Sequence, residues 1–175
     1  SAYPQGVVNR STSYALSRGD WTVEANQQLE QMSECNVGGR VVINKKTRMA
    51  TLSLEVYYTA NSAANKNYLT VMMLQDSISG YQQGGSTNPA QMLDGQYIHM
   101  HVLRDVVTPL WGDEIIPTTA GTLVTKTYSY KIPEVISSPN GVDVDLDNIN
   151  FLAFVTAKQA GTPTRPILNV GALEQ

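Results

Sequence analysis

The stretch TLSLEVYYT, residues 51–59, alternates apolar and mainly polar side chains along its length. The two alternating sets are Leu52, Leu54, Val56 and Tyr58 on one side, and Ser53, Glu55 and Tyr57 on the other. Because successive side chains of a strand point to opposite faces, this period of two predicts an antiparallel strand with one buried and one solvated face.

Similar runs recur along the chain, separated by clusters of Asn, Gly, Ser and Pro. They predict strands near residues 38–44, 49–59, 67–75, 96–103, 122–132, 150–158 and 165–172. Short strands at this spacing are typical of two packed sheets. We therefore expect a mainly β protein, an immunoglobulin-like antiparallel β-sandwich of about seven strands, over residues 36–175.

Residues 1–35 show a different pattern. Apolar positions at helical spacing predict one helix: Trp21, Ala25, Leu29 and Met32. Asp20 is of a residue type that caps helices, and we expect it to do so here. The run YPQGVVNR ahead of it predicts a turn and a short strand.

Composition excludes several functions. Charged residues are 15% of the chain against 42% hydrophobic ones, a balance that favours an extracytoplasmic β protein. The net charge of −3, with Lys and Arg scattered, argues against nucleic acid as a partner. No apolar run is long enough for a membrane helix, so we expect membrane association only through a removed anchor or a partner. Cys35, the only cysteine, is expected outside the sandwich as an inert thiol.

The densest group of chemical side chains is YIHMHVLRDVVTPLWGDEI, residues 97–115. On one strand His99 and His101 would share a face and could bind a metal, with Asp105, Asp113 or Glu114 as third ligand. The alternative, which we favour, is that both rings make structural hydrogen bonds. A hydrolase lacks a nucleophile in a recognisable setting.

The remaining residues of this stretch favour a structural joint that also includes Tyr97. We expect Arg104 to bridge to Asp105, Asp113 or Glu114, and Trp111 with Gly112 to form an anchored, flexible turn. Long connections at residues 76–95 and 104–121 lie on either side of the histidines, and long loops in compact domains are often functional.

Alternate aspartates occur in GVDVDLDNIN, at positions 143, 145 and 147. They could gather oxygen ligands for calcium, but the run departs from the EF-hand pattern. We favour an edge strand whose carboxylates discourage pairing.

Three runs carry a family resemblance: NYLTVMMLQDSISGYQQGG, YIHMHVLRDVVTPLWGDEI and ILNV. They resemble the twenty-eight-kilodalton outer-membrane protein family of Gram-negative anaerobes, in which a tyrosine, paired histidines, Val-Leu-Arg and a Trp-Gly turn occur in this order. The resemblance implies a secreted, envelope-associated protein, often lipid-anchored, with a thioredoxin-like domain ahead of a β-sandwich. It also implies that residues 1–35 are the end of that thioredoxin-like domain.

We therefore expect a non-catalytic module of the cell envelope, associated with the outer membrane, that binds an envelope protein or glycan through its long loops. No cofactor is expected. The alternative is a metal-dependent enzyme or sensor that uses His99 and His101.

Overall fold

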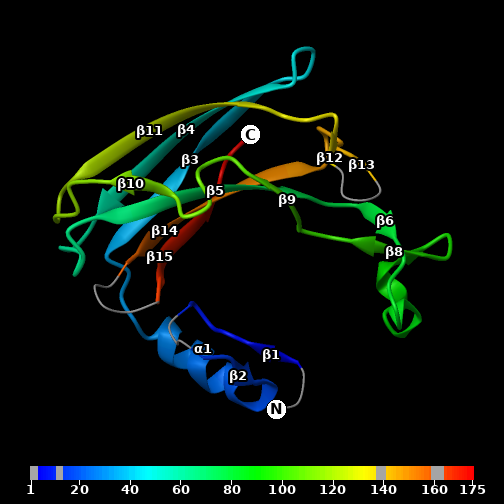
Figure 1. The fold of residues 1–175 in the computed structure, drawn as a ribbon, viewed down its shortest axis with the longest axis horizontal. Helices are drawn as coiled ribbons and strands as arrows, with labels where there is room; N and C mark the ends of the chain where they lie inside the picture. The colour runs from blue at the N-terminus through cyan, green and yellow to red at the C-terminus, as the bar shows by residue number, and fades with distance from the viewer. Residues whose placement is uncertain (1–3, 11–13, 137–140, 159–163) are drawn as a thin grey trace.

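Two antiparallel sheets pack face to face in a computed structural model that describes residues 4–10, 14–136, 141–158 and 164–175 (Figure 1). The first sheet has the order β11-β4-β3 and is formed by β3 (Cys35–Asn44), β4 (Met49–Tyr58) and β11 (Leu123–Lys131). The second has the order β10-β5-β14-β15, with β9 also paired to β5. Its strands are β5 (Asn67–Gln75), β9 (Val102–Val106), β10 (Asp113–Ile115), β14 (Ile149–Ala157) and β15 (Ile167–Ala172). The predicted antiparallel sandwich is confirmed.

The core lies between the inner faces of the two sheets. From β4 it takes the apolar set predicted from the alternation, Leu52, Leu54, Val56 and Tyr58, each at most 1% exposed. From the opposite sheet it takes alternate residues of β5 and β14: Leu69, Val71, Met73, Phe151, Ala153 and Val155. Burial of each large apolar side chain contributes roughly 1.5–3 kcal/mol, so these faces hold the sheets together.

One side of the sandwich is closed by the end of the chain. The Glu174 carbonyl accepts a hydrogen bond of 2.7 Å from the Val41 amide, and the Glu174 amide donates one of 3.0 Å to the Gly39 carbonyl. Gly171 on β15 also lies against β3, where an added Cβ would be 2.5 Å from the Val37 carbonyl oxygen. The edges of β3 and β15 are therefore joined.

Smaller elements lie outside the two sheets. A separate sheet, with the order β6-β8-β7, consists of β6 (Ile78–Gly80), β7 (Met92–Leu93) and β8 (Gln96–His99), with the 3-10 helices η2 (Gly85–Thr87) and η3 (Pro89–Gln91). It projects from the sandwich (Figure 1). β12 (Val135–Ile136) pairs with β13 (Val142–Asp143). The N-terminal part contains β1 (Gln5–Gly6), β2 (Leu16–Ser17), η1 (Arg18–Asp20) and α1 (Trp21–Leu29).

Three local predictions are wrong. The helix ends at Leu29, and Asp20 makes no side-chain cap, because its carboxylate instead accepts a hydrogen bond of 2.6 Å from the Ser17 hydroxyl. Cys35 is not outside the sandwich but the first residue of β3, fully buried in the core. The strand predicted at 96–103 is two strands, since the chain turns at His101, where φ is 55°.

Candidate binding surfaces

The projecting sheet β6-β8-β7 has a small packing centre of its own, built around Tyr97. The ring of Tyr97 packs on Gly85, where an added Cβ would be only 3.2 Å away. Its hydroxyl donates to the Gln91 side chain, and its ring lies 4.9 Å from that of His99. None of the described residues between Ile78 and Met100 belongs to the sandwich core. Tyr97 and His99 therefore pack against each other within this sheet rather than on the sandwich core.

Asp76 connects the projecting sheet to the sandwich. Its carboxylate accepts a hydrogen bond of 2.6 Å from the His101 amide and one of 2.9 Å from the Asn150 side chain on β14. The His101 ring nitrogen Nδ1 lies 3.5 Å from the same carboxylate, although its side chain is 75% exposed. The base of the projecting sheet is thus tied to β14 through one side chain.

The expected metal geometry is not formed by the two histidines. His99 ends β8, whereas His101 lies in the turn before β9, so they do not share one face of a continuous strand. Within the described parts of the chain, no group of three or more His, Cys, Asp or Glu side chains is arranged to hold a metal ion. The turn separates two side chains that an unbroken strand would have aligned.

Arg104 does not reach the carboxylates predicted for it. Its guanidinium donates to the Gln75 side-chain oxygen at 2.5 Å and to the carbonyls of Val142 at 2.7 Å and Asp143 at 3.3 Å. Arg104 therefore holds β9 against β13. It still joins two segments, but these are not the segments predicted from the sequence.

Asp105 faces the interior instead. Its carboxylate accepts a hydrogen bond of 2.5 Å from the Tyr130 hydroxyl on β11 and one of 2.7 Å from the Val106 amide. Burial and then this carboxylate raise the pKa of Tyr130, and burial and then Asp113 raise the pKa of Tyr128. Tyr130 of one sheet therefore hydrogen-bonds to Asp105 of the other, whereas Tyr128 feels the charge of Asp113 although its buried hydroxyl has no hydrogen-bond partner among the described residues.

The Trp-Gly turn is only partly as predicted. Gly112 has a φ of 82°, and an added Cβ would lie 2.9 Å from the Leu69 carbonyl oxygen, so the turn requires glycine. Trp111 is not a buried anchor, because it is 61% exposed. The Arg165 guanidinium carbon stacks on it, 4.6 Å from the ring centroid.

The alternate aspartates do not converge on a calcium site. Asp145 caps its own turn, accepting from the Asp147 amide at 3.0 Å and from the Asn148 side chain at 2.6 Å. Asp147 instead pairs with Lys45. The predicted edge strand exists only at Val142–Asp143, because a turn closed by the hydrogen bond from the Asn148 amide to the Asp145 carbonyl follows shortly after it.

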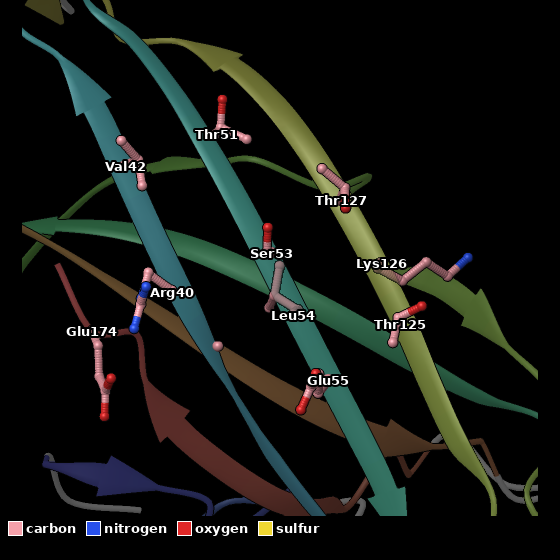
Figure 2. A pocket seen from close by; sticks show the side chains of 11 residues that line it. Arg40, Val42, Thr51, Ser53, Leu54, Glu55, Thr125, Lys126, Thr127 and Glu174 are labelled. Carbon is pink, nitrogen blue, oxygen red and sulfur yellow. The ribbon is translucent and has the colours of Figure 1, made fainter.

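The outer face of the sheet β11-β4-β3 contains an open hollow of about 820 Å³ (Figure 2). The strand register flanks each outward residue of β4 with one residue from β3 and one from β11, giving the rows Arg40–Ser53–Thr127, Gly38–Glu55–Thr125 and Asn36–Tyr57–Leu123. The alternation predicted this polar face but not its depth, because the depth depends on how β3 and β11 are arranged beside β4.

Both the sequence and the fold resemble those of known proteins. Residues 1–172 match the family model described as outer membrane protein Omp28. HBP35 of Porphyromonas gingivalis has a similar structure, with a TM-score of 0.66 and 17% identity over 91% of this chain and 48% of that one. The chain thus spans about half the length of HBP35. A domain of the outer membrane lipoprotein Omp28 from Porphyromonas gingivalis gives a TM-score of 0.49 at 15% identity, over 82% of this chain and 89% of that one. No curated protein matches.

Proposed function

This chain belongs to the Omp28 family of outer membrane proteins, and from that premise we propose that it is a non-catalytic β-sandwich module that binds a partner protein or glycan through its long loops. It is a protein of the cell envelope, associated with the outer membrane. Among the described residues, no helix has the length and apolar character needed to cross a membrane.

The observation that carries the proposal is the projecting sheet β6-β8-β7. It contributes nothing to the sandwich core, yet it presents Tyr81 at 85% and Leu93 at 62% exposure. Large apolar side chains are costly to leave in water and are common at the centres of protein interfaces. These two residues therefore favour a protein over a glycan as the partner.

The support of the sheet also fits a binding role. Asp76 and Arg104 tie its base and the neighbouring strand β9 to β14 and β13. A loop held in one conformation before binding loses less entropy when the partner arrives. The projecting sheet is therefore suited to docking.

A pull-down from envelope extracts tests this function. The combined variant Tyr81→Ser and Leu93→Ser removes exposed apolar surface without touching the packing around Tyr97. Leu29→Ser is the matched control, because Leu29 is 83% exposed on α1. We expect wild type and control to recover a common partner and the double variant to lose it. Equal recovery by all three, or steady turnover of a screened substrate, would contradict the proposal.

We also propose that the N-terminal part is the end of a thioredoxin-like domain. The packing of β1 and β2 on α1 supports it, with the Trp21 indole donating to the Leu16 carbonyl at 3.2 Å. The Ser33 hydroxyl donates a hydrogen bond of 2.8 Å to the Leu168 carbonyl of the sandwich, which supports a boundary slightly before the expected residue 35, between Leu29 and Ser33. Limited proteolysis should cut there and leave the sandwich folded, with a melting temperature lowered at most by the loss of the contacts of Asn9 with Ile167 and of Arg10 with Phe154. First cleavage within the sandwich would contradict this boundary.

A further inference from the structure

The outer edge of β11 is the one long strand edge that the described parts of the chain leave open. The edge of β3 is occupied by Glu174. The edge of β15 is occupied by two hydrogen bonds, one from the Asn169 side chain to the Cys35 carbonyl and one from the Ser33 hydroxyl to the Leu168 carbonyl. On the other side of the second sheet, the edge is divided between the short strands β9 and β10, and the pairing of β9 with β5 contains a register shift. β11, by contrast, pairs with β4 over nine residues without a register shift.

The register shows which backbone groups of β11 are free. Thr122 accepts from the Tyr58 amide at 2.9 Å, and the Ile132 amide donates to Arg48 at 2.9 Å, so the even-numbered residues between them face β4. The odd-numbered residues then direct their N–H and C=O groups away from the sheet: Leu123, Thr125, Thr127, Ser129 and Lys131. Among the described residues, no hydrogen bond to these outward groups is formed. The edge therefore offers a row of unpaired donors and acceptors.

We propose that this edge pairs antiparallel with β11 of a second copy of the chain, about a two-fold axis at Thr127, to form one continuous six-stranded sheet. A two-fold interface requires a surface that is complementary to itself. Centring on Thr127, the middle residue of β11, allows all five outward residues to pair. Thr127 then faces Thr127 of the second copy, Thr125 faces Ser129 of the second copy, and Leu123 faces Lys131 of the second copy.

The side chains suit this register. Thr–Thr and Thr–Ser pairs across antiparallel strands are favourable, as are pairs between a β-branched and an aromatic residue. The latter arise on the inner face, where Val124 meets Tyr130 of the second copy. No two like charges are opposite each other, because Lys131 faces Leu123 of the second copy.

Lys126 distinguishes an edge strand that pairs with a second copy from one that is protected against pairing. It lies on the inner face of β11 and makes no ion pair or hydrogen bond with the described residues. An inward-pointing charge can protect an edge strand from pairing. In the proposed register, however, Lys126 faces Tyr128 of the second copy, whose neighbour Asp113 supplies the carboxylate that Lys126 lacks in the single chain. The carboxylate of Asp113 thus offsets the charge of Lys126, whose diagonal neighbour in the paired state is Lys126 of the second copy.

Cysteine crosslinking of the full chain tests the register. Opposite residues of a hydrogen-bonded pair have Cα atoms about 5.5 Å apart, within the disulfide range of roughly 4.4–6.8 Å. Thr127→Cys should form a covalent dimer on oxidation with copper phenanthroline. Thr125→Cys alone should not, since its two copies would be about 14 Å apart, but it should crosslink when mixed with Ser129→Cys. Self-crosslinking of Thr125→Cys, or none by Thr127→Cys, would overturn the proposal. The wild type, whose single cysteine Cys35 is buried, is the negative control for crosslinking.

Analytical ultracentrifugation tests the dimer itself. Thr127→Pro removes an N–H that does not bond to β4, so the chain should still fold while at least tenfold weaker association is expected. Thr127→Ala keeps the N–H and should remain dimeric. Lys126→Val should weaken the dimer. A monomeric wild type would overturn the proposal. Tighter association of Lys126→Val would also overturn it and would identify Lys126 as a charge that protects the edge.

Discussion

The Tyr130 hydroxyl on β11 donates a hydrogen bond of 2.5 Å to the Asp105 carboxylate on β9 and so links the two sheets across the open side of the sandwich. Tyr130→Phe would leave a partly buried carboxylate with one fewer donor. Hydrogen bonds to charged groups contribute about 1.5–3 kcal/mol, so we expect a loss of unfolding free energy of about this size. Urea denaturation measures it. Tyr81→Phe, which changes an exposed hydroxyl, is the control, and equal midpoints for both variants would contradict this role.

Alkaline pH should destabilise the fold. Burial, and then Glu34, raise the pKa of Cys35 from 9.0 to about 12, and burial raises that of Tyr58 from 10.0 to about 12. Above their ordinary values the unfolded chain releases these protons while the folded chain keeps them. Stability is therefore fully present below about pH 9 and falls as the pH rises toward 12.

Each such group adds a slope of up to about 1.4 kcal/mol per pH unit. Unfolding free energies measured from pH 8 upward test the effect, with Cys35→Ala as the comparison. The variant should lose the part of the slope that begins near the ordinary pKa of a thiol. A flat profile for the wild type would show that these groups titrate alike in both states.

Arg104 is expected to stabilise the contact between β9 and β13. Arg104→Lys should already lower stability, because an ammonium cannot reproduce a planar fork that reaches the Gln75 side chain and the Val142 carbonyl together. Arg104→Ala should cost about 1–2 kcal/mol, since the site is only partly buried. Lys46→Ala, at an exposed turn, is the control. Denaturation midpoints matching that control would remove Arg104 from the joint.

Gly39 and Gly38 form a matched pair on β3. A Cβ at Gly39 would lie 2.3 Å from the Ser53 carbonyl oxygen, whereas one at Gly38 would meet nothing within 4 Å. Gly39→Ala should therefore destabilise the protein by about 2 kcal/mol or more through displacement of β4. Gly38→Ala should change stability by less than about 1 kcal/mol. Thermal unfolding of the two variants measures the difference in stability. Similar melting temperatures would contradict the prediction.

Zinc should have little effect on the wild type. A ligand that binds only the folded state raises the melting temperature by mass action, but His99 ends β8 whereas His101 lies in the turn that follows it. We expect no shift at a moderate excess of zinc, either for the wild type or for His99→Ala. A rise seen only in the wild type would restore the metal-binding hypothesis.

The sequence by itself determined most of the long strands of the two sheets and the buried face of β4. In residues 51–59 the period of two identified the side chains of β4 that enter the core, since the direction of each side chain follows from its position in an extended chain. Gly112 was also identified as the flexible residue of its turn, because a positive φ is a local requirement.

Only the tertiary structure decided which side chains meet. Arg104 had three carboxylates within ten residues, yet it bonds to Gln75 and Val142, which β5 and β13 bring beside β9. The turn at His101 depends in the same way on Asp76, whose carboxylate binds the His101 amide from another strand. These contacts join residues at least 25 positions apart, so they arise from the packing of the strands, whereas the residue patterns report only the local direction of the chain.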